Sequence, residues 1–349
     1  MSSSTTHSED SSPLVTVVIP LYNGADYIAE TLTSVQRQRA PRVEVIIVDD
    51  GSTDNGREVA GGHSVQPTVL IQQHLGVAVA RNRGLAAAKG RWVAFLDQDD
   101  LWHPTHLERL IQWLSSHPGE RIAFAKEIAF TTADDANRLR EMDDLAGGWA
   151  SVHAAPDQTL DDLVQRTDVS GTGHVVRHDL TGLLNGPVSV TTSFVAEPEL
   201  LRLAGGFAPH ALAMDDYWLL ANVARLQPIV QLDQPTVFYR VHTRATSRTT
   251  KLGLPFLSSA VALRFGGGLV SSSVGLRGGG GELHLHLLGE LLASPEYRDA
   301  SFRHAVDHLA GVLWPPTGRR RQRCRARLAA RMPWLRTIIR RLPPALRLS

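Results

Sequence analysis

The sequence predicts an α/β fold in which a mostly parallel β-sheet is flanked by helices. Short apolar segments typical of buried strands recur at residues 15–20, 43–48, 68–71 and 92–96. Helical patterns separate these segments, and strands that alternate with helices form parallel sheets through right-handed crossovers. The chain has 349 residues, of which 43% are hydrophobic, so it can build one large domain or two smaller ones.

The predicted helices differ in how clearly the sequence marks them. Residues 25–38 carry apolar side chains at helical spacing, as a helix with one buried face requires. Residues 53–60 are predicted as a short helix. Residues 76–89 form a helix of mostly small side chains that Gly90 closes.

The second half of the chain is less regular. Residues 131–186 are acidic and weakly periodic, so we expect loops and short helices over the site. Beyond residue 252 glycine-rich connectors precede a region predicted to be helical. Between these regions we expect a strand at 188–196, helices at 198–203 and 213–226, and one or two strands at 229–239.

Polar residues gather where three of the predicted strands end, at residues 20–23, 49–52 and 97–100. In open sheets of this kind, ligands bind beyond the carboxyl ends of the strands. The three segments are therefore expected to share one site.

The third of these segments contains three carboxylates, Asp97, Asp99 and Asp100. Carboxylates at the tip of a buried strand repel one another and resist burial, so a cation should compensate them. Magnesium and manganese prefer oxygen ligands and are usually held by one or two carboxylates together with substrate phosphates. The alternative is a solvated acidic turn that caps the helix starting near Pro104.

Four motifs follow one another in this part of the chain. They are Pro20-Leu21-Tyr22-Asn23-Gly24, Asp49-Asp50-Gly51-Ser52-Thr53-Asp54, Ala80-Arg81-Asn82-Arg83-Gly84-Leu85 and Phe95-Leu96-Asp97-Gln98-Asp99-Asp100. In this order and at this spacing, the sequence resembles the inverting family 2 glycosyltransferases, which have the GT-A fold. The resemblance is strong over residues 15–115 and moderate over residues 185–248.

The resemblance implies a Rossmann-like, mostly parallel sheet and a division of the chain into four parts. Residues 1–13 are a Ser/Thr-rich leader expected to be disordered. Residues 14–115 would bind the nucleotide sugar, and residues 116–250 would complete the same domain with the acceptor and catalytic groups. Residues 251–349 would form a C-terminal helical extension that ends in a basic amphipathic tail.

A nucleotide sugar presents a base, a ribose, a diphosphate and a sugar. Tyr22 can stack on the base, and Asp50 can accept a hydrogen bond from the ring N–H of uracil or thymine. A simple turn with Gly51 is the alternative for the Asp49-Asp50 pair. The resemblance adds Pro20 and Asn23 to the donor-binding residues.

The diphosphate and the metal are assigned to a second group of residues. Arg81 suits phosphate oxygens, with a surface ion pair as the alternative. The resemblance places Asp97 near the ribose and the metal and makes Asp99 a direct ligand of Mn²⁺ or Mg²⁺, while Asp100 has a capping or positioning role. Arg240 would reach the diphosphate. His242 would reach the metal or the diphosphate, unless it is simply packed or solvated.

Inversion needs a general base on the face opposite the leaving group. Met214-Asp215-Asp216-Tyr217-Trp218 resembles the family's Glu-Asp signature at a helix start, with Asp216 at the position of the base and Asp215 in place of the usual Glu. The alternative is a pair of carboxylates that caps this helix. Gly206 and Trp218 are, with Asp215, candidates for the acceptor side.

The expected activity is transfer of a sugar from a UDP- or dTDP-sugar to a hydroxyl of a glycan, a lipid-linked saccharide or a natural product. One alternative is a sugar-1-phosphate nucleotidyltransferase of similar fold. Such enzymes carry a basic Gly-rich loop after the first strand, whereas the first basic residue here is Arg37. The other alternative is an inactive nucleotide-sugar-binding module, against which the carboxylates at positions 97, 99 and 216 argue.

Charge is distributed unevenly along the chain. From His308 to the end there are eleven arginines and no Lys, Asp or Glu, which leaves 25 basic and 35 acidic residues in the preceding part. The tail suits peripheral contact with an anionic membrane, and a docked helix pair has the same composition. Nucleic-acid binding is not expected, because the body is acidic. No apolar stretch is long enough to span a membrane, so a cytoplasmic location is expected, with the inner membrane face as an option.

Overall fold

The computed structural model describes residues 14–40, 42–131, 159–180, 183, 190–209, 215–242 and 244. The expected leader and the C-terminal extension with its basic tail lie outside the described residues. The chain divides into two units, residues 1–210 with 219–249, and residues 211–218 with 250–349. All the strands among the described residues belong to the first unit. Among the described residues, no helix is long and apolar enough to cross a membrane.

A single sheet organises the first unit. Its nine strands, counted over the described residues, run in the order β3-β2-β1-β4-β8-β6-β9-β5, with β7 paired to β9. The strands are β1 (Val15–Leu21), β2 (Val43–Asp49), β3 (Thr68–Ile71), β4 (Trp92–Phe95), β5 (Leu101–Trp102), β6 (Ile122–Phe130), β7 (Val175–His178), β8 (Phe194–Ala196) and β9 (Ile229–Arg240).

The direction of the strands confirms the predicted fold class. Strands β3, β2, β1 and β4 are all parallel, and β6 is parallel to β9. Antiparallel pairing enters in the second half of the sheet, where β8 joins β4 to β6. Because β1, β2 and β4 point the same way, their carboxyl ends open on one edge of the sheet.

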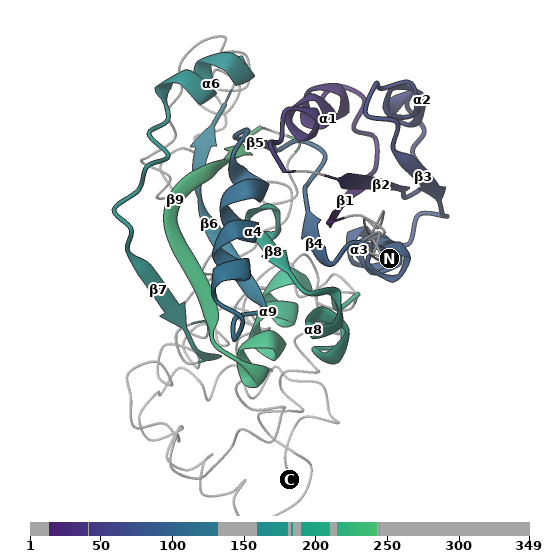
Figure 1. The fold of residues 1–349 in the computed structure, drawn as a ribbon. Coiled ribbons are helices and arrows are strands. Elements are labelled where there is room, and N and C mark those ends of the chain that lie inside the picture. The colour runs from purple at the N-terminus through teal and green to yellow at the C-terminus, as the bar shows by residue number, and fades with distance from the viewer. Residues whose placement is uncertain are drawn as a thin grey trace, which may run out of the picture. The chain divides into compact units, whose positions relative to one another are not determined.

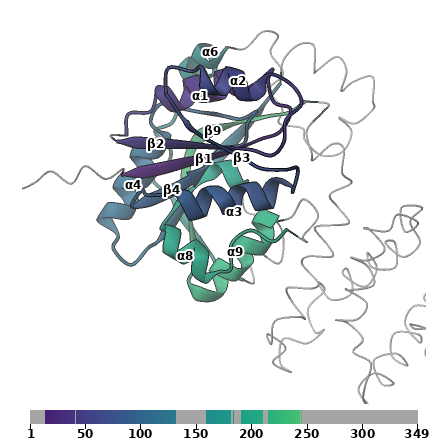
Figure 2. The ribbon, with the colours of Figure 1, turned by 90° about the vertical axis from the view of Figure 1, so that its right-hand side faces the viewer.

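Helices cover both faces of this sheet. The helices are α1 (Ile28–Gln36), α2 (Gly56–Gly61), α3 (Val77–Ala87), α4 (His106–Ser116), α6 (Leu160–Arg166), α8 (Pro198–Leu203) and α9 (Asp215–Leu226). Helices α1 and α2 lie on one side of β1 and β2, and α3 lies on the other (Figure 1). The view turned by 90° shows α8 on the same side as α3 (Figure 2).

The alternation of side chains along β1 explains the two layers. Val17 and Ile19 pack in one core with Ile28 and Leu32 of α1 and Leu107 of α4. Val18 points to the other face and packs with Ala78 and Leu85 of α3 and with residues of α8. Strand β1 is buried along its whole length, as expected for a central strand with helices on both faces.

Several sequence predictions need correction. The helix expected at 25–38 begins only at Ile28, because Gly24 to Tyr27 form a turn closed by the bond from Tyr27 N to Gly24 O. Only Phe194–Ala196 of the expected strand 188–196 is a strand, preceded by the 3₁₀ turn η2 (Thr191–Ser193). Within 131–186, strand β7 was not expected; its regularity comes from antiparallel pairing with β9. Strand β6 was not predicted either, while the expected segment 229–239 is the single strand β9.

Two buried histidines tie the start of α4 to the sheet. The Nδ1 atom of His106 lies 2.8 Å from Thr236 Oγ1, and its ring stacks on Trp102 with centroids 4.6 Å apart. Burial lowers the pKa of His106 to about 3. Burial, together with Arg109 and Arg39, lowers the pKa of His103 to about 4.

We expect these histidines to make the protein acid-labile. Their folded pKa values lie below the ordinary value of 6.5, so their stabilising effect is present above pH 6.5 and is lost as the pH falls toward 4 and 3. His106 alone should lower the free energy of unfolding by on the order of 2 kcal/mol between pH 7 and pH 5. Urea unfolding of the protein and of His106→Phe across this range measures the effect.

The variant should lose less stability than the natural protein on going from pH 7 to pH 5. Replacement of the exposed, non-titrating Leu203 by alanine is the control and should leave the pH dependence unchanged. Equal pH dependence in His106→Phe and the natural protein would contradict the prediction.

Candidate functional site

The carboxyl ends of β1 and β4 are joined by one side chain, Gln98. Its Oε1 accepts a hydrogen bond from Tyr22 N (2.8 Å), and its Nε2 donates to Tyr22 O (3.1 Å). A Cβ atom on Gly24 would lie 2.4 Å from Gln98 Oε1, so only glycine leaves room for this bridge. Gln98 was not predicted from the sequence, because an amide among carboxylates has no distinctive pattern.

Asn23 joins the ends of β1 and β2. Its backbone N–H donates to Ser52 Oγ (3.1 Å), and its side-chain Oδ1 accepts from Thr53 N (2.8 Å). The residue has a φ of 48°, which asparagine tolerates better than most residues. The buried Asp49 fixes the same loop, since its Oδ1 accepts from Ser52 N (3.0 Å). The three strand-end segments are therefore adjacent, as predicted.

Asp50 anchors the loop between β3 and α3. Its Oδ1 accepts from Gln72 Nε2 (2.7 Å) and Leu75 N (2.8 Å), and its Oδ2 accepts from Gly76 N (2.9 Å). His74 Nδ1 lies 3.2 Å from the same Oδ2. This nearly buried carboxylate thus has a structural task in addition to the base contact that the sequence predicts for it.

Arg81 on α3 is buried and points to the acidic segment after β4. Its Nη2 donates to Asp97 Oδ1 over 2.5 Å, and its guanidinium lies 5.4 Å from the ring centroid of Phe207. The neighbouring Asn82 holds the loop of Gly206, because it exchanges two 2.8 Å hydrogen bonds with the backbone of Phe207. Arg81 is therefore the buried member of an ion pair whose carboxylate, Asp97, keeps 30% of its side chain exposed.

Asp99 meets the end of β9. Its Oδ2 lies 2.9 Å from His242 Nε2, and the buried His242 ring packs against Tyr27 with centroids 4.8 Å apart. The Nδ1 atom of His242 is buried without a hydrogen-bond partner among the described residues. The two predicted metal residues from distant segments, Asp99 and His242, are thus brought into contact.

Asp100 is the buried residue of the acidic segment 97–100, and its contacts position the segment. Its Oδ2 accepts from Thr192 Oγ1 (2.7 Å), and its Oδ1 accepts from Arg240 N (2.9 Å). Burial raises the pKa of Asp100 well above its ordinary value, and the negative charges of Asp99 and Asp97 add to the rise. The alternative of helix capping is wrong, because α4 begins after Thr105 and no side chain caps it.

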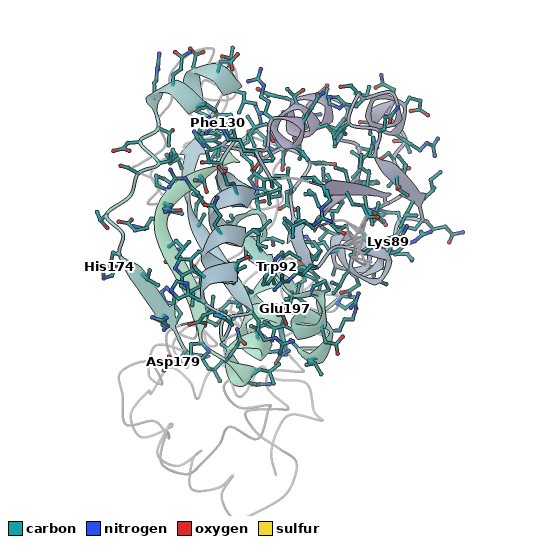
Figure 3. The ribbon with its side chains drawn as sticks, in the orientation of Figure 1. Lys89, Trp92, Phe130, His174, Asp179 and Glu197 are labelled. Atoms are coloured by element: carbon teal, nitrogen blue, oxygen red, sulfur yellow. The ribbon has the colours of Figure 1, made fainter. Side chains whose placement is uncertain are left out.

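Arg240 holds the backbone of the acidic segment 97–100. Its Nε donates to Asp99 O (2.7 Å) and its Nη2 to Glu30 Oε2 (2.6 Å). Its guanidinium lies 5.3 Å from the ring centroid of Tyr27 and 4.6 Å from that of Phe130 (labelled in Figure 3), which packs with Leu160 and Leu163 of α6. The side chain therefore binds protein groups where the sequence suggested the diphosphate.

The candidate base lies at the start of helix α9. Asp216 Oδ1 accepts a hydrogen bond from Tyr217 N (2.6 Å), while Asp215 is buried and opens the helix as predicted. Asp215, Asp216 and Trp218 belong to the second unit, and the metal candidates belong to the first. The general-base role of Asp216 and the acceptor-side roles of Asp215, Trp218 and Gly206 remain predictions.

The donor set suits a magnesium or manganese ion that substrate phosphates help to hold. Asp99 offers a carboxylate that is 21% exposed, and His242 offers an imidazole nitrogen beside it. Within the described ranges, no three His, Cys, Asp or Glu side chains gather closely enough to hold a metal ion on their own. An ion bound by one or two protein groups and a diphosphate needs no such cage.

Comparison with known proteins points to one family. Residues 16–180 match the family model described as glycosyl transferase family 2. The chain is 32% identical over 216 residues to TuaG of Bacillus subtilis, a glycosyltransferase named for teichuronic acid biosynthesis. The aligned region covers 60% of this chain and 81% of TuaG. It is 43% identical over 100 residues to the uncharacterized glycosyltransferase YibD of Escherichia coli, which covers 28% and 29% of the two chains.

A solved structure shares the fold. The structure of residues 1–349 of S. aureus TarS in complex with UDP-GlcNAc superimposes with a TM-score of 0.55 at 14% identity, over 85% of this chain and 81% of that chain. At this identity the likeness concerns the fold alone.

We expect Arg240 to stabilise the protein more than its partner Glu30 does. Arg240→Lys keeps the charge but loses the planar fork that reaches Asp99 O and Glu30, and should lower the free energy of unfolding by about 2 kcal/mol. Glu30→Gln should cost less than about 1 kcal/mol, because the Glu30 side chain is 39% exposed. Urea unfolding of both variants measures the difference, and equal losses would contradict this role of Arg240.

Proposed function

The chain belongs to the family 2 glycosyltransferases, and on this premise we propose that it transfers a sugar from a nucleoside diphosphate sugar to an acceptor hydroxyl with inversion at the anomeric carbon. The proposed acceptor is a hydroxyl of a glycan, a lipid-linked saccharide or a natural product. A nucleotidyltransferase and an inactive binding module are disfavoured, because the relatives are named as glycosyltransferases.

One observation carries the proposal. The segments after β1, β2, β4 and β9, together with α3, are joined by hydrogen bonds into a single site. This site combines an exposed aromatic ring, a buried arginine and carboxylates, which match the base, the diphosphate and the metal of a nucleotide sugar. Such a combination is expected where parallel strands end at a ligand site.

The donor residues divide by the part of the donor that they suit. Tyr22 is 41% exposed and offers a face on which a base can stack, and Asp50, which shares His74 as a neighbour with Tyr22, would accept from a ring N–H. This pairing favours uracil or thymine, so a UDP- or dTDP-sugar is the proposed donor. Arg81 is held by Asp97 beside the place proposed for the diphosphate.

A divalent cation, Mn²⁺ or Mg²⁺, is proposed as the cofactor. Asp99 and His242 would hold it, with Asp97 nearby, and the ion would neutralise the negative charge that develops on the leaving nucleoside diphosphate. Arg81 would share this task by donating to phosphate oxygens. Arg240 and Asp100 hold the backbone of the acidic segment, so that Asp97 and Asp99 keep their positions.

Asp216 is the proposed general base. It would accept the proton of the acceptor hydroxyl as the hydroxyl oxygen attacks the anomeric carbon. Its place at the start of a helix suits a carboxylate, because the helix dipole favours negative charge there. Peripheral membrane contact by the basic tail at the inner face of the membrane remains a prediction from sequence.

Asp216→Asn should abolish transfer while it spares donor binding. We expect kcat to fall by about 10²–10⁴, the usual contribution of a general base, with little change in the Kd for the donor nucleotide. Glu199→Gln is the matched control, because it removes an exposed carboxylate from the first turn of α8 without touching the site. Full turnover by Asp216→Asn would refute the assignment.

Removal of the metal tests the cofactor assignment. With UDP present, Mn²⁺ should raise the thermal unfolding temperature, and Asp99→Asn should remove this rise. Asp26→Asn is the control, since this exposed carboxylate pairs with Arg244. A rise that survives in Asp99→Asn would exclude Asp99 as a ligand. Donor hydrolysis that is lost with EDTA and restored by Mn²⁺ would support the proposal, and release of pyrophosphate from a nucleoside triphosphate would overturn it.

A further inference from the structure

The His74 side chain makes two contacts that are unusual for an exposed histidine. Its ring stacks on Tyr22, with centroids 4.1 Å apart and planes inclined by 24°. Its Nδ1 lies 3.2 Å from Asp50 Oδ2, although the His74 side chain is 59% exposed. The ring thus bridges the aromatic face and the buried carboxylate that are proposed for the donor base.

A pyrimidine base in the proposed site would make the same two contacts. Its ring would stack on Tyr22, and its ring N–H would donate to the Asp50 carboxylate. The base cannot enter between the two rings as they stand, because a ring inserted there needs a spacing of roughly 7 Å, twice the ordinary contact distance of carbon atoms. Either His74 leaves, or the base must stack on the other face of Tyr22.

The contacts of Asp50 show which partner can leave. Leu75 N, Gly76 N and Gln72 Nε2 lie 2.7–2.9 Å from the carboxylate oxygens, and two of the three are backbone groups of the anchored loop. His74 is the most distant partner, with its Nδ1 3.2 Å from Asp50 Oδ2 and 3.3 Å from Asp50 O, and it contacts Asp50 through a side chain that is 59% exposed. It can therefore rotate into solvent without disturbing the loop.

We propose that His74 is a specificity-determining residue of the donor site, which occupies the place of the base and is exchanged for it when the donor binds. This inference rests on the proposed function. The exchange keeps Tyr22 and Asp50 in contact with a partner in the absence of donor. It lowers the affinity for every nucleotide, and most for those that cannot replace both contacts.

The test compares UDP binding by calorimetry in the natural protein, His74→Ala and His74→Gln. Both variants remove the competing ring, so both should bind UDP about 3- to 10-fold more tightly. His117→Ala is the matched control: His117 is also exposed and stacks on Trp113 with centroids 4.1 Å apart, and its replacement should leave the Kd unchanged. Unchanged or weaker UDP binding in the His74 variants would overturn the inference.

Histidine NMR signals give a second measurement that loop loosening would not reproduce. In the natural protein, UDP should remove the ring-current shift that Tyr22 imposes on His74, while His117 keeps its own. A His74 signal that does not move at saturating UDP would overturn the inference and leave the proposed function standing. Failure of the natural protein to bind UDP or dTDP with Mn²⁺ would contradict the donor assignment and the exchange together.

Discussion

The structure depends on the compensation of negative charge at the carboxyl ends of β2 and β4. Asp50, Asp97, Asp99 and Asp100 all lie where strands end, and burial of a carboxylate is costly without partners. Each carboxylate has its own hydrogen-bond partners: the β3–α3 loop for Asp50, Arg81 for Asp97, His242 for Asp99, and Thr192 with the backbone of Arg240 for Asp100. These partners come from distant parts of the chain, so the same contacts that satisfy the carboxylate oxygens assemble the site.

The same requirement separates supporting residues from residues available to a ligand. Asp100 and Arg240 are buried and bind protein groups, whereas Asp97 and Asp99 keep 30% and 21% of their side chains exposed. Tyr22 and His74 are exposed as well and stack on each other, and His74 also contacts Asp50. A site built in this way holds its acidic groups in place before a donor arrives, which lowers the cost of ordering them on binding.

Most of the fold of the first hundred residues could be predicted from the sequence. The strands at 15–20, 43–48, 68–71 and 92–96 were found because apolar runs bounded by turns mark central strands strongly. Strand β7 was missed, since its backbone order comes from pairing with β9 and not from its own composition. Gln98, His74, Asn82 and Thr192 were missed for a related reason: an amide, a hydroxyl or an exposed histidine has no distinctive pattern until its partner is known.

The sequence by itself determined the family, the strand-end location of the site and the identity of its carboxylates, because these depend on local patterns and on motif spacing. Only the tertiary structure decided what each side chain contacts. Arg240 was expected at the diphosphate and instead donates to Glu30 and Asp99 O. Asp100 was expected to cap a helix or to position the segment, and it accepts a hydrogen bond from Thr192. The physical reason is that the partners of buried charges and donors lie on distant segments of the chain. Local sequence patterns do not show which of these segments the fold brings into contact.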